Sequence, residues 1–109
     1  MANPSILHLV LTTEANERGA ESLARKLLER QLVACISLTT MHSLYRWEGG
    51  LQEDREVQLL MKTTAEQLEP LRRAVMELHS YDTPEWLSWP VEASQDYGSW
   101  AAASCCSET

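Results

Sequence analysis

The spacing of apolar residues along the chain changes several times, and each change marks a new predicted element. Residues 6–11 are apolar at five of six positions, a run too short for a helix, so we predict a buried strand there. In residues 16–30 the apolar positions recur every three or four residues, which is the spacing of one helix face. This predicted helix face is formed by Ala20, Leu23, Ala24, Leu27 and Leu28.

Two long strands joined by a glycine turn are predicted next. Residues 33–38 begin a strand that continues in 43–47, and 48–50 form a turn signal because glycine adopts positive φ without steric cost. Residues 53–63 alternate between apolar and polar side chains, as a half-buried strand does. Each arm exceeds ten residues, about twice the usual strand length. The hairpin should therefore project beyond the rest of the fold and need a partner, for which an oligomer is the simplest solution.

A second helix is predicted after the hairpin, where apolar residues again recur at helical spacing. Thr64 and Gln67 fit a capping box, with Thr64 as the N-cap and the Gln67 side chain reaching back. Pro70 lacks a backbone donor and should distort the first turns or delay the regular helix. The predicted stripe consists of Leu68, Leu71, Val75 and Leu78.

The last two elements are shorter. Residues 86–89 predict a fourth strand, which Pro90 places at a sheet edge or ends. Residues 96–103 predict a short helix with Asp96 as its cap. The order of all elements is β-α-β-β-α-β plus a short helix, which is the α+β ferredoxin-like arrangement with a four-stranded antiparallel sheet. We expect one domain over residues 1–103 and a flexible tail at 104–109.

Charge and composition limit the classes of partner. The 109 residues include 16 acidic and 9 basic ones, for a net charge of −7, and no Lys/Arg cluster. Nucleic acid is therefore not an expected partner. No run of about 18 apolar residues is present, so no membrane span is expected. The first residues also lack the basic region of a signal peptide, and we expect a cytoplasmic protein.

Few residues suit a metal ion. Cys35, Cys105 and Cys106 form no Cys-x-x-Cys motif, and no His pair has zinc-finger spacing, so a structural zinc site is not expected. Cys35 and His79 are candidate ligands, because thiolate and imidazole suit copper. The alternative is that Cys35 packs as a small hydrophobic residue and His79 ends a helix. The tail cysteines are either an adaptable site for a soft metal or two free thiols.

Four segments resemble the CutA family of divalent-ion tolerance proteins. Their order and spacing cover the chain from about Leu9 to Trp100, although Ser80 stands where the family usually has proline. Thr12 and Leu78 stand where some bacterial members carry Cys and His, residues discussed as copper ligands, so only His79 of that set is present. The segments are 43–49 (Ser-x-Tyr-x-Trp-x-Gly), 53–63 (Glu-x-x-Glu-Val-x-Leu-x-x-Lys-Thr), 79–85 (His-Ser-Tyr-x-x-Pro-Glu) and 96–100 (Asp-Tyr-x-x-Trp).

The resemblance implies a homotrimer in which long hairpins extend the sheets of neighbouring subunits. It also implies kinship with the PII signalling proteins. No reaction is assigned to the family, so we expect a protein that is not an enzyme and needs no cofactor, with copper or another divalent cation as a candidate ligand. The expected function is divalent-ion tolerance or signalling through clefts between subunits. Two alternatives stay open: a PII-like module that docks onto a protein partner, and an enzyme with an intersubunit site around Lys62.

The resemblance also places six side chains near a cleft between subunits. They comprise aromatic rings, one cation and two carboxylates, a set that suits a small ligand. The same set could instead be an ion-pair and aromatic network that holds the trimer together. In either case, Lys62 suits an anionic group and Glu56 or Glu85 could pair with it. The six are Tyr45, Trp47, Glu56, Lys62, Tyr81 and Glu85.

Overall fold

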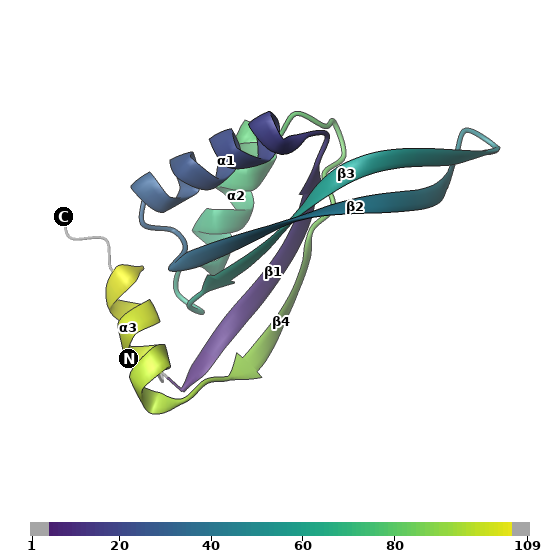
Figure 1. Ribbon diagram of the computed structural model, residues 1–109. Helices are drawn as coiled ribbons and strands as arrows, with labels where there is room; N and C mark the ends of the chain where they lie inside the picture. The colour runs from purple at the N-terminus through teal and green to yellow at the C-terminus, as the bar shows by residue number, and fades with distance from the viewer. Residues whose placement is uncertain (1–4, 106–109) are drawn as a thin grey trace.

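A computed structural model describes residues 5–105 and has the predicted α+β architecture (Figure 1). All strand pairs are antiparallel, and the sheet order is β2-β3-β1-β4, as the ferredoxin-like prediction requires. The elements are β1 (Ile6–Glu14), α1 (Glu17–Glu29), β2 (Cys35–Trp47), β3 (Gly50–Thr63), α2 (Leu68–Leu78), β4 (Leu87–Glu92) and α3 (Gln95–Ser104).

The ends of helix α1 are set by local sequence features, a side-chain cap at Asn16 and a turn at Gln31. The Asn16 side chain accepts a hydrogen bond from the Gly19 backbone N–H at 2.8 Å, which satisfies one of the free donors of the first turn. Glu17 lies in the first turn and Lys26 in the last, where each complements the helix dipole. After the helix, Gln31 takes a positive φ of 58°, and the chain turns toward β2.

The strands are longer than the apolar runs predicted. β1 continues past residue 11 to Glu14, and β2 shows no break between the two predicted pieces because every residue from Cys35 to Trp47 pairs with β3. β3 begins at Gly50 rather than at residue 53. Glu48 and Gly49 both have positive φ, at 50° and 78°, so a two-residue turn closes the hairpin.

The predicted capping box before α2 forms only in half. The Gln67 backbone N–H donates to Thr64 Oγ1 at 3.4 Å, but the Gln67 side chain donates to the Cys105 carbonyl oxygen at 2.8 Å instead of reaching back. Gln67 itself is the N-cap, and the regular helix begins only at Leu68. Pro70 thus falls in the first turn, where a missing backbone donor costs no helical hydrogen bond.

Toward the end of the chain, one strand boundary and one helix cap differ from the prediction. β4 is an edge strand, as expected, but it continues through Pro90 to Glu92. A proline is tolerated there because an edge strand has only one neighbour, β1, in which His8 pairs with Pro90. Ser94, not Asp96, caps α3, and its hydroxyl accepts from the Tyr97 N–H at 3.3 Å. Cys105 is buried after α3, so the packed part of the chain reaches that residue, while Cys106 lies outside the described residues.

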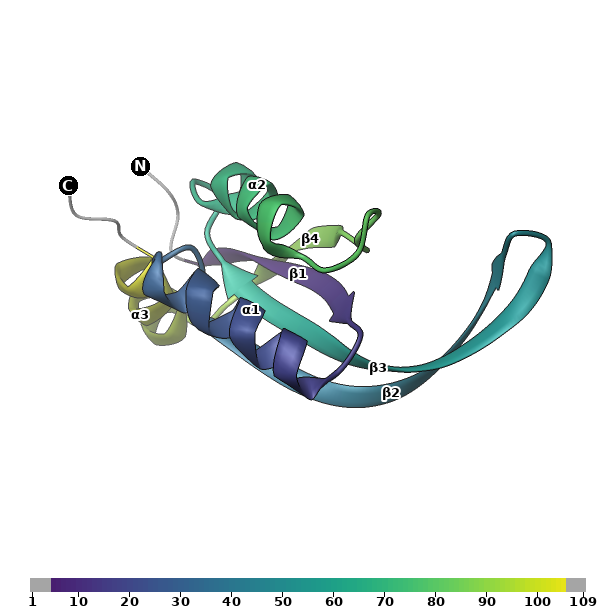
Figure 2. The same ribbon diagram turned by 90° about the horizontal axis from the view of Figure 1, so that it is seen from above.

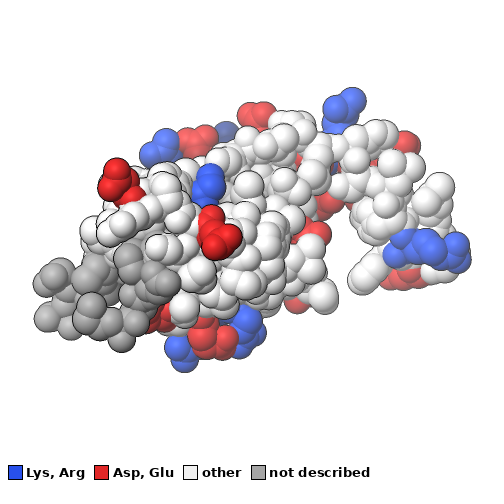
Figure 3. Space-filling view, turned by 90° about the horizontal axis from the view of Figure 1, so that it is seen from below, with Lys and Arg blue, Asp and Glu red and all other residues white. Residues whose placement is uncertain are grey.

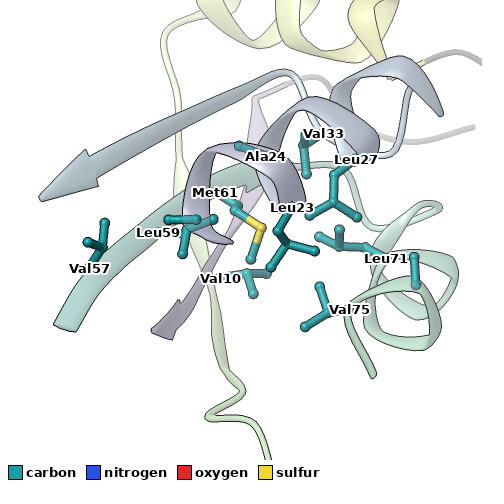
Figure 4. Close-up of a cluster of buried hydrophobic side chains, with 12 residues drawn as sticks. Val10, Leu23, Ala24, Leu27, Val33, Val57, Leu59, Met61, Leu71 and Val75 are labelled. Carbon is teal, nitrogen blue, oxygen red and sulfur yellow. The ribbon is translucent and has the colours of Figure 1, made fainter. Parts of the chain in front are cut away.

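One side of the sheet is covered by α1 and α2, which enclose the main core (Figure 4). Val10, Leu59 and Met61 from the sheet are fully buried against Leu27 of α1 and Leu71 of α2. A second cluster forms where α3 packs over Leu7, with Ala34, Ala101 and Cys105. In residues 5–105, no helix is long and apolar enough to cross a membrane.

Among residues 5–105, the other side of the sheet, which we call the open face, is covered only at the end where α3 lies. Successive side chains of a strand point to opposite faces, so Leu9 and Leu11 face away from Val10, and residues that pair across strands share a face. Seen from below Figure 1, the side away from α1 and α2 is a broad surface with few charged side chains (Figure 3). Its two rows across the sheet are Cys35-Lys62-Leu9-Trp89 and Ser37-Leu60-Leu11-Leu87.

The β2–β3 hairpin projects beyond the helix layer, as predicted (Figures 1 and 2). β1 ends opposite Val57, but β2 and β3 continue for seven more cross-strand pairs, which lengthens the molecule to 47 × 27 × 20 Å. Near its tip, Trp47 and Leu51 are 59% and 73% exposed. This two-stranded arm therefore buries little of its own apolar surface.

Neighbouring leucines of α1 test the core. Leu27→Ala should lower the free energy of unfolding by about 3 kcal/mol, because it leaves a cavity against both the sheet and α2. Leu28→Ala, at a position that is 42% exposed, should cost less than about 1 kcal/mol. Urea unfolding of both variants measures the difference, and equal losses would show that α1 packs on a different face.

Candidate functional site

Five of the six predicted cleft residues lie on, or reach, the open face. Glu56 and Lys62 lie an even number of residues from Leu60 on β3, so their side chains share its face. Tyr45 and Trp47 lie on the same face, because they pair with residues of β3 that also share it. Tyr81 reaches this face from the segment after α2, where its hydroxyl donates to Glu56 Oε2 at 2.8 Å. The sixth, Glu85, is exposed in the segment before β4 and has no hydrogen bond within residues 5–105.

Within one chain, Lys62 lies apart from the Glu56–Tyr81 pair. Lys62 and Glu56 are six residues apart on one strand, which places them about 20 Å apart. The predicted ion pair of Lys62 with Glu56 or Glu85 is therefore not made inside the chain. Instead Lys62 Nζ lies 3.7 Å from Cys35 Sγ and 3.4 Å from Ser37 Oγ.

His79 is buried at the end of α2, where it is the C-cap residue. Its Nε2 lies 2.6 Å from the Thr13 carbonyl oxygen, and because a carbonyl only accepts, Nε2 must carry the proton. Its Nδ1 accepts from the Tyr81 backbone N–H at 3.0 Å. Both ring nitrogens are thus used inside the chain, and a metal ion at His79 would have to displace the Tyr81 N–H.

Beside His79 lies Glu14, a buried carboxylate that sequence reasoning missed. Its Oε1 accepts from the Ser80 hydroxyl at 2.5 Å and the Ala15 N–H at 3.1 Å, while its Oε2 accepts from the Ser80 N–H at 3.1 Å. Burial alone would raise the pKa of Glu14, but these bonds and the nearby His79 ring outweigh burial and lower that pKa below its usual range. No clear signal in the sequence pointed to it, because Glu14 lies three positions beyond the apolar run at residues 6–11 and is the last residue of β1.

Within residues 5–105, Ser80 supplies two of the three hydrogen-bond donors to the Glu14 carboxylate. Both the Ser80 backbone N–H and its hydroxyl donate to Glu14. Proline, which the resemblance leads us to expect here, has neither donor. The serine therefore fixes the start of the segment between α2 and β4 to the end of β1, and His79 and Tyr81 on either side of it take their positions from the same contact.

Tyr81 acts as a hydrogen-bond donor at the base of the hairpin. Burial and the Glu56 carboxylate raise the pKa of Tyr81 far above its usual value, so the phenol keeps its proton. Its ring lies 4.9 Å from the His79 ring, centre to centre. Farther along the hairpin, the Tyr45 hydroxyl donates to Asp54, and this bond raises the pKa of Tyr45 as well.

The candidate metal ligands are not brought together. Cys35 lies opposite Lys62, whereas His79 contacts Thr13, which lies opposite Gln58. Across residues 5–105, no three His, Cys, Asp or Glu side chains are grouped so that they could hold a metal ion.

The carboxylate of Glu14 should make stability depend on pH. Glu14→Gln should lower the free energy of unfolding by about 2 kcal/mol near pH 7, since it weakens charge-assisted bonds to Ser80. A lowered folded-state pKa stabilises the fold above the unfolded pKa of about 4.3, and that stabilisation disappears as the pH falls through the folded value. The difference from wild type, measured by urea unfolding between pH 3 and 7, should therefore shrink below about pH 4. The exposed control Glu17→Gln loses a helix-dipole interaction and should cost less than about 1 kcal/mol, and a pH-independent deficit in Glu14→Gln would contradict the assignment.

Comparison with known proteins gives consistent relatives for both sequence and fold. The family model described as "CutA1 divalent ion tolerance protein" matches residues 8–104. The divalent-cation tolerance protein CutA of Yersinia pestis (strain Pestoides F) is 41% identical over 98 residues, which cover 88% of this chain and 82% of the relative.

Solved structures agree with the fold over nearly the whole chain. CutA from Synechococcus elongatus PCC7942 superimposes with a TM-score of 0.90 at 36% identity, covering 97% of this chain and 95% of that one. CutA1 from Oryza sativa gives a TM-score of 0.88 at 30% identity, covering 94% and 96%. The periplasmic divalent cation tolerance protein CutA from Archaeoglobus fulgidus gives 0.87 at 28%, covering 91% and 98%. The chain therefore belongs to the CutA1 divalent ion tolerance protein family.

Proposed function

We propose that this chain is a non-enzymatic homotrimer that acts in divalent-cation tolerance through clefts between its subunits. The observation that carries the proposal is the open face, where apolar side chains from three strands remain uncovered. Leu9, Leu11 and Leu60 are half-buried at its centre, and Trp89 and Leu87 remain 39% and 51% exposed. Fully burying such a side chain contributes about 1.5–3 kcal/mol, so a second copy covering this face would be strongly stabilised.

The hairpin supports self-association independently. Its strands have free edges beyond the end of β1, and exposed edges of this length pair readily with other strands. The CutA resemblance supplies the number of copies, three, and the arrangement in which each hairpin extends a neighbour's sheet. In that arrangement Tyr45 and Trp47 would line the boundary between two subunits, together with the Glu56–Tyr81 pair.

The metal role in this proposal is indirect. Neither nitrogen of His79 is free, and the described residues of one chain gather no ligand set. Tolerance would then follow from a small ligand or a protein partner at the clefts rather than from chelation by His79 and Cys35. The relatives are named for tolerance and not for a reaction, which favours a protein that is not an enzyme.

The free thiols favour a reducing compartment. Cys35 and Cys105 are both unbridged, and cytoplasmic proteins keep their thiols in this state. We therefore place the protein in the cytoplasm, whereas the Archaeoglobus fulgidus relative is described as periplasmic.

The oligomer is tested by mass and by one substitution at the centre of the open face. Sedimentation equilibrium should give about three times the chain mass of 12.4 kDa. Leu60→Glu places a charge between Ser37 and Leu11 and should yield monomers. Leu28→Glu, on the exposed side of α1, should leave the mass unchanged. A wild-type mass near that of a single chain would refute the proposal.

Direct metal binding is tested by calorimetric titration with Cu²⁺ and with Zn²⁺. We expect His79→Ala to give the same heats as wild type, because the imidazole is already bonded on both sides. The same result is expected for Cys35→Ser. Saturable binding that either substitution removes would show that the trimer assembles a metal site, and the indirect role would then be wrong.

A further inference from the structure

Lys62 is a half-buried cation whose contacts in the described part of the chain carry no charge. There its ammonium group contacts only a thiol and a hydroxyl, Cys35 Sγ at 3.7 Å and Ser37 Oγ at 3.4 Å. No carboxylate within residues 5–105 comes within ion-pair distance of it. On the open face its neighbour across the strands is Leu9, so the surroundings offer little polar compensation.

Covering the open face would make this arrangement costly. A charge removed from water is destabilising by several kcal/mol unless an opposite charge replaces the lost hydration. In the open chain, water can still reach the half-buried ammonium group. In the homotrimer of the proposed function, the same group would lie at a covered surface. A carboxylate from the covering copy is the simplest compensation.

Glu56 is the carboxylate whose position and hydrogen bonds best suit an ion pair with Lys62 of another copy. It lies on the same face as Lys62, at the base of the projecting hairpin, and is half-buried. The Tyr81 hydroxyl holds its Oε2, and the Tyr81 backbone is held in turn by His79. Its Oε1 has no hydrogen bond to any described residue, so a fixed carboxylate presents one free oxygen. Asp54, the other acidic residue of this face, is exposed and is bound by Tyr45.

We propose that Lys62 of one subunit forms an ion pair with Glu56 of a neighbouring subunit in the homotrimer. The inference rests on the proposed function, because a single chain keeps the two groups about 20 Å apart on β3. The pair explains why a lysine occupies an otherwise apolar row of the sheet. It would also fix which part of a hairpin lies against which part of its neighbour, since charge pairs at interfaces set register.

A charge exchange tests the pair. The single reversals Lys62→Glu and Glu56→Lys should each lower the apparent thermal midpoint of the trimer by at least about 5 °C, a shift expected for the loss of about 1 kcal/mol in a domain of this size. The double variant, with both reversals, should recover more than half of the loss, because the pair is restored with opposite polarity. Arg55→Glu, a reversal on the opposite face of the same strand, is the matched control and should change the midpoint little.

A second variant separates the ion pair from the Tyr81 contact. Glu56→Lys also removes the acceptor of the Tyr81 hydroxyl, and Tyr81→Phe removes that bond alone. If Tyr81→Phe reproduces the whole loss and the double variant shows no recovery while the mass remains trimeric, the pair is refuted and the proposed trimer stands. A monomeric wild type refutes the trimer itself.

Two further results would identify a different partner for Lys62. If Asp54→Lys, rather than Glu56→Lys, restores the thermal midpoint of Lys62→Glu, the partner of Lys62 is Asp54. Stabilisation by inorganic phosphate that Lys62→Gln abolishes would indicate a bound anion. Either of these results overturns the proposal.

Discussion

A four-stranded antiparallel sheet has two faces, and the helices within residues 5–105 cover only one of them completely. α1 and α2 bury Val10, Leu59 and Met61 on one side, while α3 covers only the end of the other side, over Leu7. The alternation of side chains along each strand leaves Leu9, Leu11 and Leu60 facing outward. The open face is therefore a direct consequence of the fold, and the cost of leaving its leucines in water supports the proposed association of copies.

The candidate site depends on the same asymmetry. β1 stops at Glu14, so β3 continues without its inner neighbour, and the segment from His79 to Tyr81 lies beside the end of β1. There Ser80 is hydrogen-bonded to Glu14, and the next residue, Tyr81, donates a hydrogen bond from its hydroxyl to Glu56 at the base of the hairpin. The Tyr81–Glu56 contact thus forms where the strand pairing of the body ends.

His79 illustrates how a candidate ligand acquires a structural role. A buried imidazole must satisfy both nitrogens, and here the Thr13 carbonyl and the Tyr81 N–H do so. The same two bonds join β1 to the segment after α2. The imidazole ring thereby positions Tyr81, so His79 contributes to the site by placing this tyrosine and not by offering a lone pair to a metal ion.

The sequence alone determined the element order, the long hairpin and the apolar face of α1, because each depends on local periodicity or on a short turn signal. Through the CutA motifs it also predicted six cleft residues, of which contacts within the described chain join only Tyr81 and Glu56. Only the tertiary structure decided that Gln67 bonds Cys105 instead of completing a capping box, and that Glu14 holds Ser80. These contacts join residues 38 and 66 positions apart, and side-chain partners at such separations follow from packing, which no local pattern encodes.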